Sequence, residues 1–112
     1  MTNSEKVFCR KQIEAVNTTQ YTCPSDASIA VITKFTVTNT SAATVNFSCN
    51  LVESGDTVGD QNLIVDARPI AAGETWNAAS LVGQKIETAG IISTLASAAT
   101  SLTISVCGYE VS

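Results

Sequence analysis

The side chains best suited to chemistry in this sequence are carboxylates, and three of them gather in one polar stretch. The segment "ESGDTVGD" (residues 53–60) brings together Glu53, Asp56 and Asp60. Clustered carboxylate oxygens are ligands that Ca²⁺ prefers, but the ligand spacing of an EF-hand loop is missing. Paired carboxylates can also act as the acid and base of a glycosidase. Because charged residues in turns ordinarily keep loops hydrated, we predict a solvated loop here, with neither a metal site nor a catalytic one.

Nucleophilic catalysis is the next possibility, and the residue types exclude its usual forms. The chain has no histidine, so Ser–His and Cys–His nucleophile pairs cannot form. It also has no glycine-rich phosphate loop of the G-x-G-x-x-G or G-x-x-x-x-G-K-[ST] kind. We therefore predict a protein that is not an enzyme, with no catalytic residues and no cofactor.

Four cysteines are left as potential metal ligands or disulfide partners: Cys9, Cys23, Cys49 and Cys107. None has the C-x-x-C spacing of zinc or redox sites, so we predict no metal centre. Cys49 falls on the apolar face of an alternating segment and is predicted to be buried, whereas Cys107 is out of phase with its apolar neighbours. Reduced thiols are expected for a protein made in a cytoplasm. Disulfides formed after release from a cell are the alternative, and the sequence leaves their pairing open.

Two aromatic and two basic residues are candidates for contacts with a partner. Trp76 and Tyr109 could stack on a sugar, although a lone tryptophan in a small domain is more often an anchor in a core or an interface. Arg10 and Lys11 form the only adjacent basic pair in the chain. We take these four residues as the candidate interaction anchors.

Charge and hydropathy argue against two classes of partner. The net charge is −4 and no run of Lys or Arg occurs, so we expect no nucleic-acid binding. No apolar stretch approaches the roughly 20 residues that span a bilayer, so we expect no membrane insertion. The polar N-terminal segment "MTNSEKVFCRKQ" lacks the apolar core of a secretory signal, which predicts synthesis in a cytoplasm without export by that route.

Alternation of apolar and polar residues predicts that most of the chain is β-strand. The residues of segment 43–52 that are predicted to share one face are Ala43, Val45, Phe47, Cys49 and Leu51. Similar segments recur about every ten residues between turn signals such as "CPSDAS". The chain of 112 residues is therefore predicted to be an all-β protein. Its architecture should be an antiparallel β-sandwich, jelly-roll-like, with about seven to nine short strands.

The same pattern predicts how the segments are arranged. Residues 1–17 are expected to form an N-terminal arm or edge segment, and residues 18–112 the β-sandwich domain. Segments 28–39 and 43–52 are expected to pair as an antiparallel hairpin. The next strand, "NLIVDAR", is expected to stop at Pro69.

One further expectation concerns the faces of segment 28–39. Its apolar residues that are predicted to share one face are Ile29, Val31, Phe35 and Val37.

The composition favours a protein that works inside an assembly. Charged residues make up 14% of the chain, about half the usual share for a soluble domain. A surface with so little charge is unusual for a freely diffusing monomer. The predicted strands present mainly hydroxyl and amide groups on their polar faces, which suits contact with neighbouring subunits better than catalysis.

Several short features follow one another along the chain: Tyr21 with Pro24, Asn39 with Ser41, the turn Gly73-Glu74-Thr75, the segment from Leu81 to Ile86, and Gly108 with Glu110. In this order they resemble the small all-β virion proteins of tailed bacteriophages. The resemblance covers roughly residues 18–112. The first 17 residues and the four cysteines lie outside it. No set of binding residues carries over, because the shared features mark turns and not contacts.

This resemblance implies a non-enzymatic structural protein of the virion. Within the group, the implied role is a capsid decoration or cement protein, which binds the outer shell, often as a homotrimer, and stabilises it. Its partners would be the major capsid protein or other virion proteins. The alternative is a minor component of the neck, tail or fibre, including a carbohydrate-binding module for host attachment.

Overall fold

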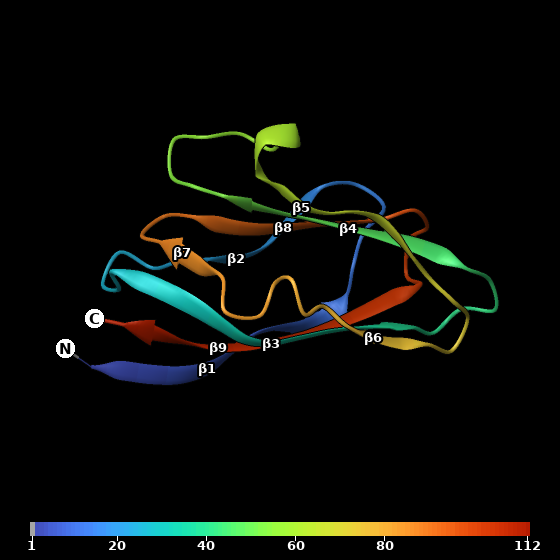
Figure 1. The fold of residues 1–112 in the computed structure, drawn as a ribbon, viewed down its shortest axis with the longest axis horizontal. Coiled ribbons are helices and arrows are strands. Elements are labelled where there is room, and N and C mark those ends of the chain that lie inside the picture. Colours follow the sequence, from blue (N-terminus) through green and yellow to red (C-terminus); the bar gives the residue numbers. More distant parts are fainter. Residues whose placement is uncertain (1) are drawn as a thin grey trace.

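The computed structural model describes residues 2–112, which form nine β-strands and one short 3₁₀ helix (Figure 1). The strands are β1 (Asn3–Gln12), β2 (Thr18–Thr22), β3 (Ile29–Asn39), β4 (Val45–Val52), β5 (Leu63–Ile70), β6 (Thr75–Asn77), β7 (Lys85–Glu87), β8 (Ile91–Ala96) and β9 (Leu102–Val111). The helix η1 (Asp60–Asn62) immediately precedes β5. All strand pairs are antiparallel, which confirms the predicted all-β class.

The strands form two facing sheets with jelly-roll winding (Figure 1). Sheet A has the order β1–β9–β3–β6, and β7 also pairs with β3; sheet B has the order β2–β8–β4–β5. Strands β1 to β4 alternate between the two sheets. Of the later strands, β9 lies between β1 and β3 in sheet A, and β8 lies between β2 and β4 in sheet B. This interleaved order is that of a jelly roll built from two Greek keys. The predicted jelly-roll-like sandwich is therefore confirmed.

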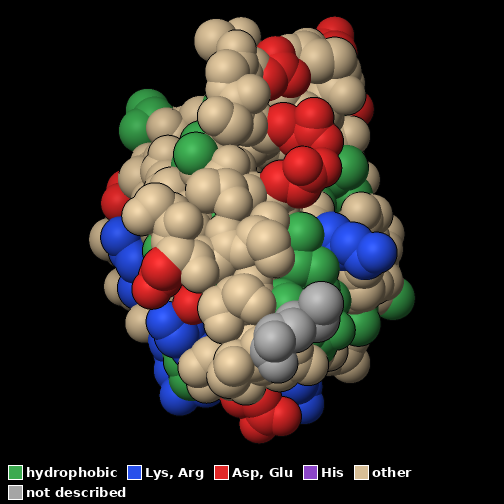
Figure 2. Space-filling view, turned by 90° about the vertical axis from the view of Figure 1, so that its left-hand side faces the viewer, with side chains coloured by type: hydrophobic (Ala, Val, Ile, Leu, Met, Phe, Trp, Pro, Cys, Tyr) green, Lys and Arg blue, Asp and Glu red, His purple; other side chains and the backbone are tan. Residues whose placement is uncertain are grey.

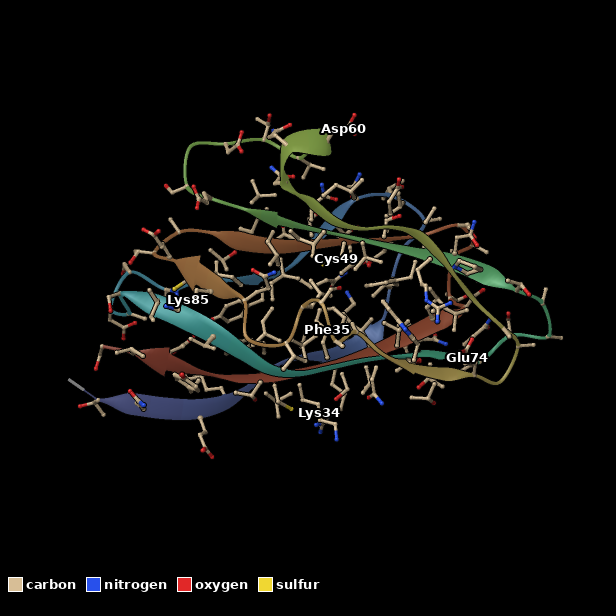
Figure 3. All side chains as sticks on the ribbon, in the orientation of Figure 1. Lys34, Phe35, Cys49, Asp60, Glu74 and Lys85 are labelled. Carbon is tan, nitrogen blue, oxygen red and sulfur yellow. The ribbon has the colours of Figure 1, made fainter. Side chains whose placement is uncertain are left out.

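The core lies between the sheets and is built around two phenylalanines. Phe35 of β3 and Phe47 of β4 are fully buried, with ring centroids 5.8 Å apart. Figure 3 shows Phe35 and Cys49 between the two sheets, whereas Lys34 points away from sheet A on its outer side. The other buried side chains are mostly branched aliphatic residues, as the low aromatic content predicts.

β-Bulges change which residues of β3 face the core. The register between β3 and β9 shifts between Ile32 and Lys34, leaving Thr33 as the extra residue. Because a bulge inverts the alternation, Ala30 and Ile32 are fully buried on one side of it and Phe35 on the other. The prediction that Ile29, Val31, Phe35 and Val37 share one face is therefore wrong for Ile29 and Val31.

Strand β4 keeps the predicted alternation along its length. Val45, Phe47 and Cys49 are buried and Leu51 packs against the core, as predicted. The pairing of β4 with β8 is regular, and the register shifts beside Cys49 place the extra residues in the neighbouring strand β5. Ala43 precedes the strand and is exposed. Beyond Cys49, Asn50 is buried as well, because the loop 53–62 folds over sheet B and accepts hydrogen bonds from its amide.

The predicted hairpin between segments 28–39 and 43–52 is wrong, because β3 and β4 belong to different sheets. Asn39 at the end of β3 holds this crossing in place. Its Nδ2 atom donates to the carbonyl oxygens of Ala43 and Ile70, each at 2.8 Å. Its Oδ1 atom accepts hydrogen bonds from the backbone N–H and the hydroxyl of Ser41. The buried amide thus closes the bend that takes the chain from sheet A to sheet B.

The expectation that Pro69 ends its strand is also wrong. Strand β5 continues through Pro69, which lies opposite Asn46, to Ile70. Because β5 is the outermost strand of sheet B, proline at this position removes no hydrogen bond from the sheet interior.

The N-terminal strand β1 is an outermost strand of sheet A. Strand β1 pairs along its whole length with β9, and Ile13 after it is buried in the core. Met1 lies outside the described residues. Among residues 2–112, no helix has the length and apolar character needed to cross a membrane.

Candidate interaction surface

The outer face of sheet A carries hydroxyl groups at one end. Cross-strand neighbours there are Thr38 with Thr103 and Thr36 with Ser105, and Thr75 of β6 lies beside Thr38. The hydroxyl oxygens of Thr38 and Thr75 are 2.9 Å apart and share a hydrogen bond. We call these five residues the hydroxyl patch. The patch presents donors and acceptors on short side chains, which suits contact with another protein surface.

Two of the predicted anchors, Arg10 and Tyr109, lie on this same outer face. Arg10 of β1 lies opposite Ser105, donates to its hydroxyl oxygen at 3.1 Å and reaches the Cys107 sulfur at 3.9 Å. Tyr109 of β9 is half-buried and lies opposite Glu5. The structure therefore brings these two anchors onto one surface, at separate positions along β9.

The anchor Lys11 does not share that face. Lys11 lies opposite the buried Ile104, in the row that faces sheet B, and its ammonium pairs with Glu14 at 3.2 Å. Both side chains of this pair are exposed, so the ion pair adds little stability. The adjacent basic pair of the sequence is thus divided between the two faces of β1.

Trp76 packs against the core and is covered by a cation. Its ring meets Phe47 edge-on, with centroids 6.2 Å apart. The guanidinium carbon of Arg68 lies 4.9 Å from the Trp76 ring centroid. Because a sugar would need an open ring face, this arrangement argues against Trp76 as a carbohydrate platform and assigns it to the core.

A cluster of ionisable groups that the sequence pattern does not predict lies where β1, β2 and β9 meet. Glu110 of β9 is buried, and its carboxylate accepts a hydrogen bond from the Tyr21 hydroxyl at 2.5 Å and pairs with Lys6 at 2.7 Å. The Tyr21 ring stacks on Phe8 at a centroid distance of 4.1 Å. The signal that could have found the cluster was Glu110 itself, which falls in the inward-facing row of β9 with Ile104 and Val106.

These contacts shift the ionisation of all three groups. The hydrogen bond from Lys6, followed by that from Tyr21, holds the pKa of Glu110 below its ordinary value of 4.5. Burial, followed by the hydrogen bond to Glu110, raises the pKa of Tyr21 above its ordinary range. The hydrogen bond to Glu110 raises the pKa of Lys6. The cluster is therefore a closed ion pair that joins the two sheets, and it has no group set to exchange a proton near neutral pH.

We predict that this cluster makes the fold sensitive to acid. Because the folded-state pKa of Glu110 is lowered, its stabilisation is complete above about pH 4.5 and is lost as pH falls through the lower folded-state value. Glu110→Gln should lower the free energy of unfolding at neutral pH and flatten its decline under acid. Urea unfolding followed by circular dichroism at several pH values measures both effects. The exposed Glu53→Gln serves as control, and an unchanged acid profile in Glu110→Gln would contradict the assignment.

All four cysteines, within residues 2–112, are free thiols. Cys23 and Cys49 are buried, and Cys9 and Cys107 are half-buried. Burial raises the pKa of the Cys49 thiol to about 12 and also raises the pKa values of Cys9 and Cys23.

These differences predict the order in which the thiols react. A maleimide reagent added to the native protein should label the half-buried Cys9 and Cys107 before the buried thiols and leave Cys49 unlabelled until the protein unfolds, because burial shields Cys49 from the reagent and raises its pKa. Peptide mass spectrometry after timed labelling measures the order. Labelling of Cys49 as fast as Cys107 would show that the core opens far more readily than this packing implies.

The acidic loop 53–60 is organised by its own hydrogen bonds. Asp56 accepts hydrogen bonds from the Thr57 backbone and from the side chains of Gln61 and Asn62, which lowers the Asp56 pKa. Figure 2 shows acidic side chains gathered at the top of the molecule, where this loop lies. In the part of the chain that the structure describes, no group of three His, Cys, Asp or Glu residues is placed to hold a metal ion.

The edges of the sheets differ in how open they are to pairing. Strands β6 and β7 have three residues each and β2 has five. Strand β5 contains Pro69 and bends at Ala67, whose φ is 48°. Strand β1, by contrast, has ten residues and no proline. Short or proline-containing edges resist pairing, so β1, although it has a bulge at Phe8, offers the longest accessible edge.

Comparisons with models of known families, with curated proteins and with solved structures found no match to this chain.

Proposed function

We propose that this protein is a non-enzymatic structural component of a tailed-bacteriophage virion. In its most specific form, it is a capsid decoration or cement protein that binds the outer shell and stabilises it. Its partner is the major capsid protein, and the resemblance implies a homo-oligomer, a trimer when docked on the shell. The protein is made in the host cytoplasm and ends on the virion surface.

The observation that carries this proposal is the pairing of a low-charge hydroxyl surface with an open edge strand on the same sheet. The hydroxyl patch and Arg10 provide hydrogen-bonding groups on the outer face of sheet A. Strand β1 provides a further edge at which backbone groups are accessible. An open edge strand and a surface with little charge promote aggregation of a free protein. In a subunit held between neighbours they provide the contacts that hold it.

The fold gives independent support. Jelly rolls of two Greek keys are frequent in viral capsid domains, although the same architecture also serves lectins and cupins. A fold alone does not determine a function. The resemblance to phage virion proteins, carried by Tyr21, Pro24, Asn39 and Ser41, selects among these roles. In this structure Asn39 and Ser41 form the crossing between the sheets.

The test is to count the protein in purified virions and then remove it. Quantitative mass spectrometry should find it in copy numbers comparable with those of the major capsid protein. Capsids that lack it should release DNA at a lower temperature, and added purified protein should restore the original value. Capsids that are equally heat-resistant without it would contradict the cement role.

The same count separates the shell from the alternative location. A component of the neck, tail or fibre would be present in far fewer copies than the shell protein. Glycan binding is not favoured by any contact of Trp76, whose ring is occupied by Phe47 and Arg68. A shift of tryptophan fluorescence on titration with host-surface glycans would restore that possibility.

A further inference from the structure

Strand β1 combines backbone accessibility with an exposed apolar centre. Nearly all of its residues are exposed, and only Phe8 and Cys9 are partly covered. Val7 is 53% exposed, the highest value for a large hydrophobic side chain in any strand of residues 2–112. Glu5, two residues before Val7, forms no ion pair or side-chain hydrogen bond within the described residues. A partner strand is therefore the natural occupant of this edge.

The bulge in β1 determines which of its residues share a face. The register with β9 shifts between Val7 and Cys9, so Phe8 is the extra residue. Glu5, Val7 and Arg10 consequently lie in the outer row, opposite Tyr109, Cys107 and Ser105 of β9. Lys6 and Lys11 lie in the inner row, opposite Gly108 and Ile104. Opposite charges on the outer row thus flank Val7 at nearly equal distances along the strand.

This arrangement is self-complementary about Val7. If a second copy pairs antiparallel, with a twofold axis at Val7, Glu5 lies opposite the partner's Arg10 and Arg10 opposite the partner's Glu5. In the inner row, Lys6 then lies opposite the partner's Cys9. Opposite charges on facing strands are favourable, and the two valines meet at the centre. A symmetric contact repeats each of these interactions twice.

The neighbouring registers are disfavoured by the same charges. A shift of two residues one way places Lys6 opposite the partner's Lys6, and a shift the other way places Lys6 opposite the partner's Lys11. Like charges directly opposite each other destabilise a strand pair. A shift of one residue would turn the outer row of one copy toward the inner row of the other. The charges on β1 therefore select one register.

We propose that β1 pairs antiparallel with β1 of a second copy of this chain, centred on Val7, so that sheet A continues across both subunits. The contact joins two copies in solution and, on a shell, joins neighbouring assemblies. It leaves the hydroxyl patch of each copy uncovered for a different partner. The inference does not depend on the virion role, because it concerns the free protein.

A charge-exchange series on the full chain tests the pairing. Light scattering of the purified protein should give about 23 kDa, twice the 11.7 kDa of one chain. Glu5→Arg places like charges opposite each other and should weaken the dimer about tenfold or more by sedimentation equilibrium. Arg10→Glu should do the same, and the double variant Glu5→Arg/Arg10→Glu should restore wild-type affinity. Glu53→Arg makes the same charge change in the distant loop and should leave the dimer intact.

A cross-link tests the register. In a Cys107→Ser background, which removes the thiol directly opposite Val7 on β9, Val7→Cys should give a disulfide-linked dimer under mild oxidation, seen on a non-reducing gel, whereas the exposed loop variant Val82→Cys in the same background should give much less. Circular dichroism of each variant confirms that it is folded.

Three results would overturn the proposal: a monomer at micromolar concentration, a dimer that Glu5→Arg leaves unchanged, or single variants that the double exchange does not rescue. A trimer in solution would also overturn it. Failure of capsid binding by an intact dimer would instead count against the virion role alone.

Discussion

Replacing Gly108 with alanine is expected to cost about 3 kcal/mol or more of unfolding free energy. A β-carbon at this position would overlap the carbonyl oxygen of Val31 and lie 2.6 Å from the Phe8 ring. The carbonyl belongs to the central strand β3, so it cannot move without separating β3 from β9. The same contact would displace Phe8 from its stack on Tyr21. Urea unfolding monitored by circular dichroism measures the loss.

Gly73→Ala is the matched control for this substitution. Gly73 has a φ of 77°, and a β-carbon there would meet no atom within 4 Å. Only the backbone conformation is penalised, so the expected loss is about 1 kcal/mol. Equal losses in the two variants would show that the approach of Val31 and Phe8 to position 108 does not limit stability.

Phe47→Ala is expected to lower the free energy of unfolding by about 3–5 kcal/mol. The Phe47 side chain is fully buried and contacts the rings of both Phe35 and Trp76. With few other aromatic residues available to close the cavity, the surrounding aliphatic side chains can collapse only partly. The loss of the contact with Phe47 should also change the Trp76 fluorescence, which gives a second, local readout.

The exposed Val82→Ala is the control for Phe47→Ala. Val82 is 45% exposed, so its truncation should change the unfolding free energy by less than about 0.5 kcal/mol. A loss below about 1 kcal/mol for Phe47→Ala would contradict the position of Phe47 at the centre of the core.

The sequence was informative wherever alternation ran without interruption. Leu102, Ile104 and Val106 are all buried, as their period of two predicts, and Cys107 faces the other way. The pattern failed at bulges. An inserted residue such as Thr33 inverts every later side chain, and nothing in local alternation shows where the insertion lies.

Pairing between distant strands was the second limit. The short segment after Asn39 looks like a hairpin turn, yet the side chain of Asn39 bends the chain across to the other sheet. The ionic cluster was missed for the same reason. Lys6, Tyr21 and Glu110 are far apart in the chain and meet only because β1, β2 and β9 come together at one end of the sandwich. Local patterns carry no information on such contacts.

Placing β9 between β1 and β3 also has a consequence for synthesis on the ribosome. Both neighbours of β9 are made long before it, and neither can complete its hydrogen bonding until residues 102–111 have emerged. The nascent chain therefore holds a gap in the middle of sheet A until residues 102–111 have emerged, with β1 wholly unpaired on one side and one edge of β3 unpaired on the other. Closure of that gap depends on contacts between distant residues, which form slowly. Assembly can thus begin only once β9 is in place, when β1 has been fixed against β9 and its outer edge is the one that remains open.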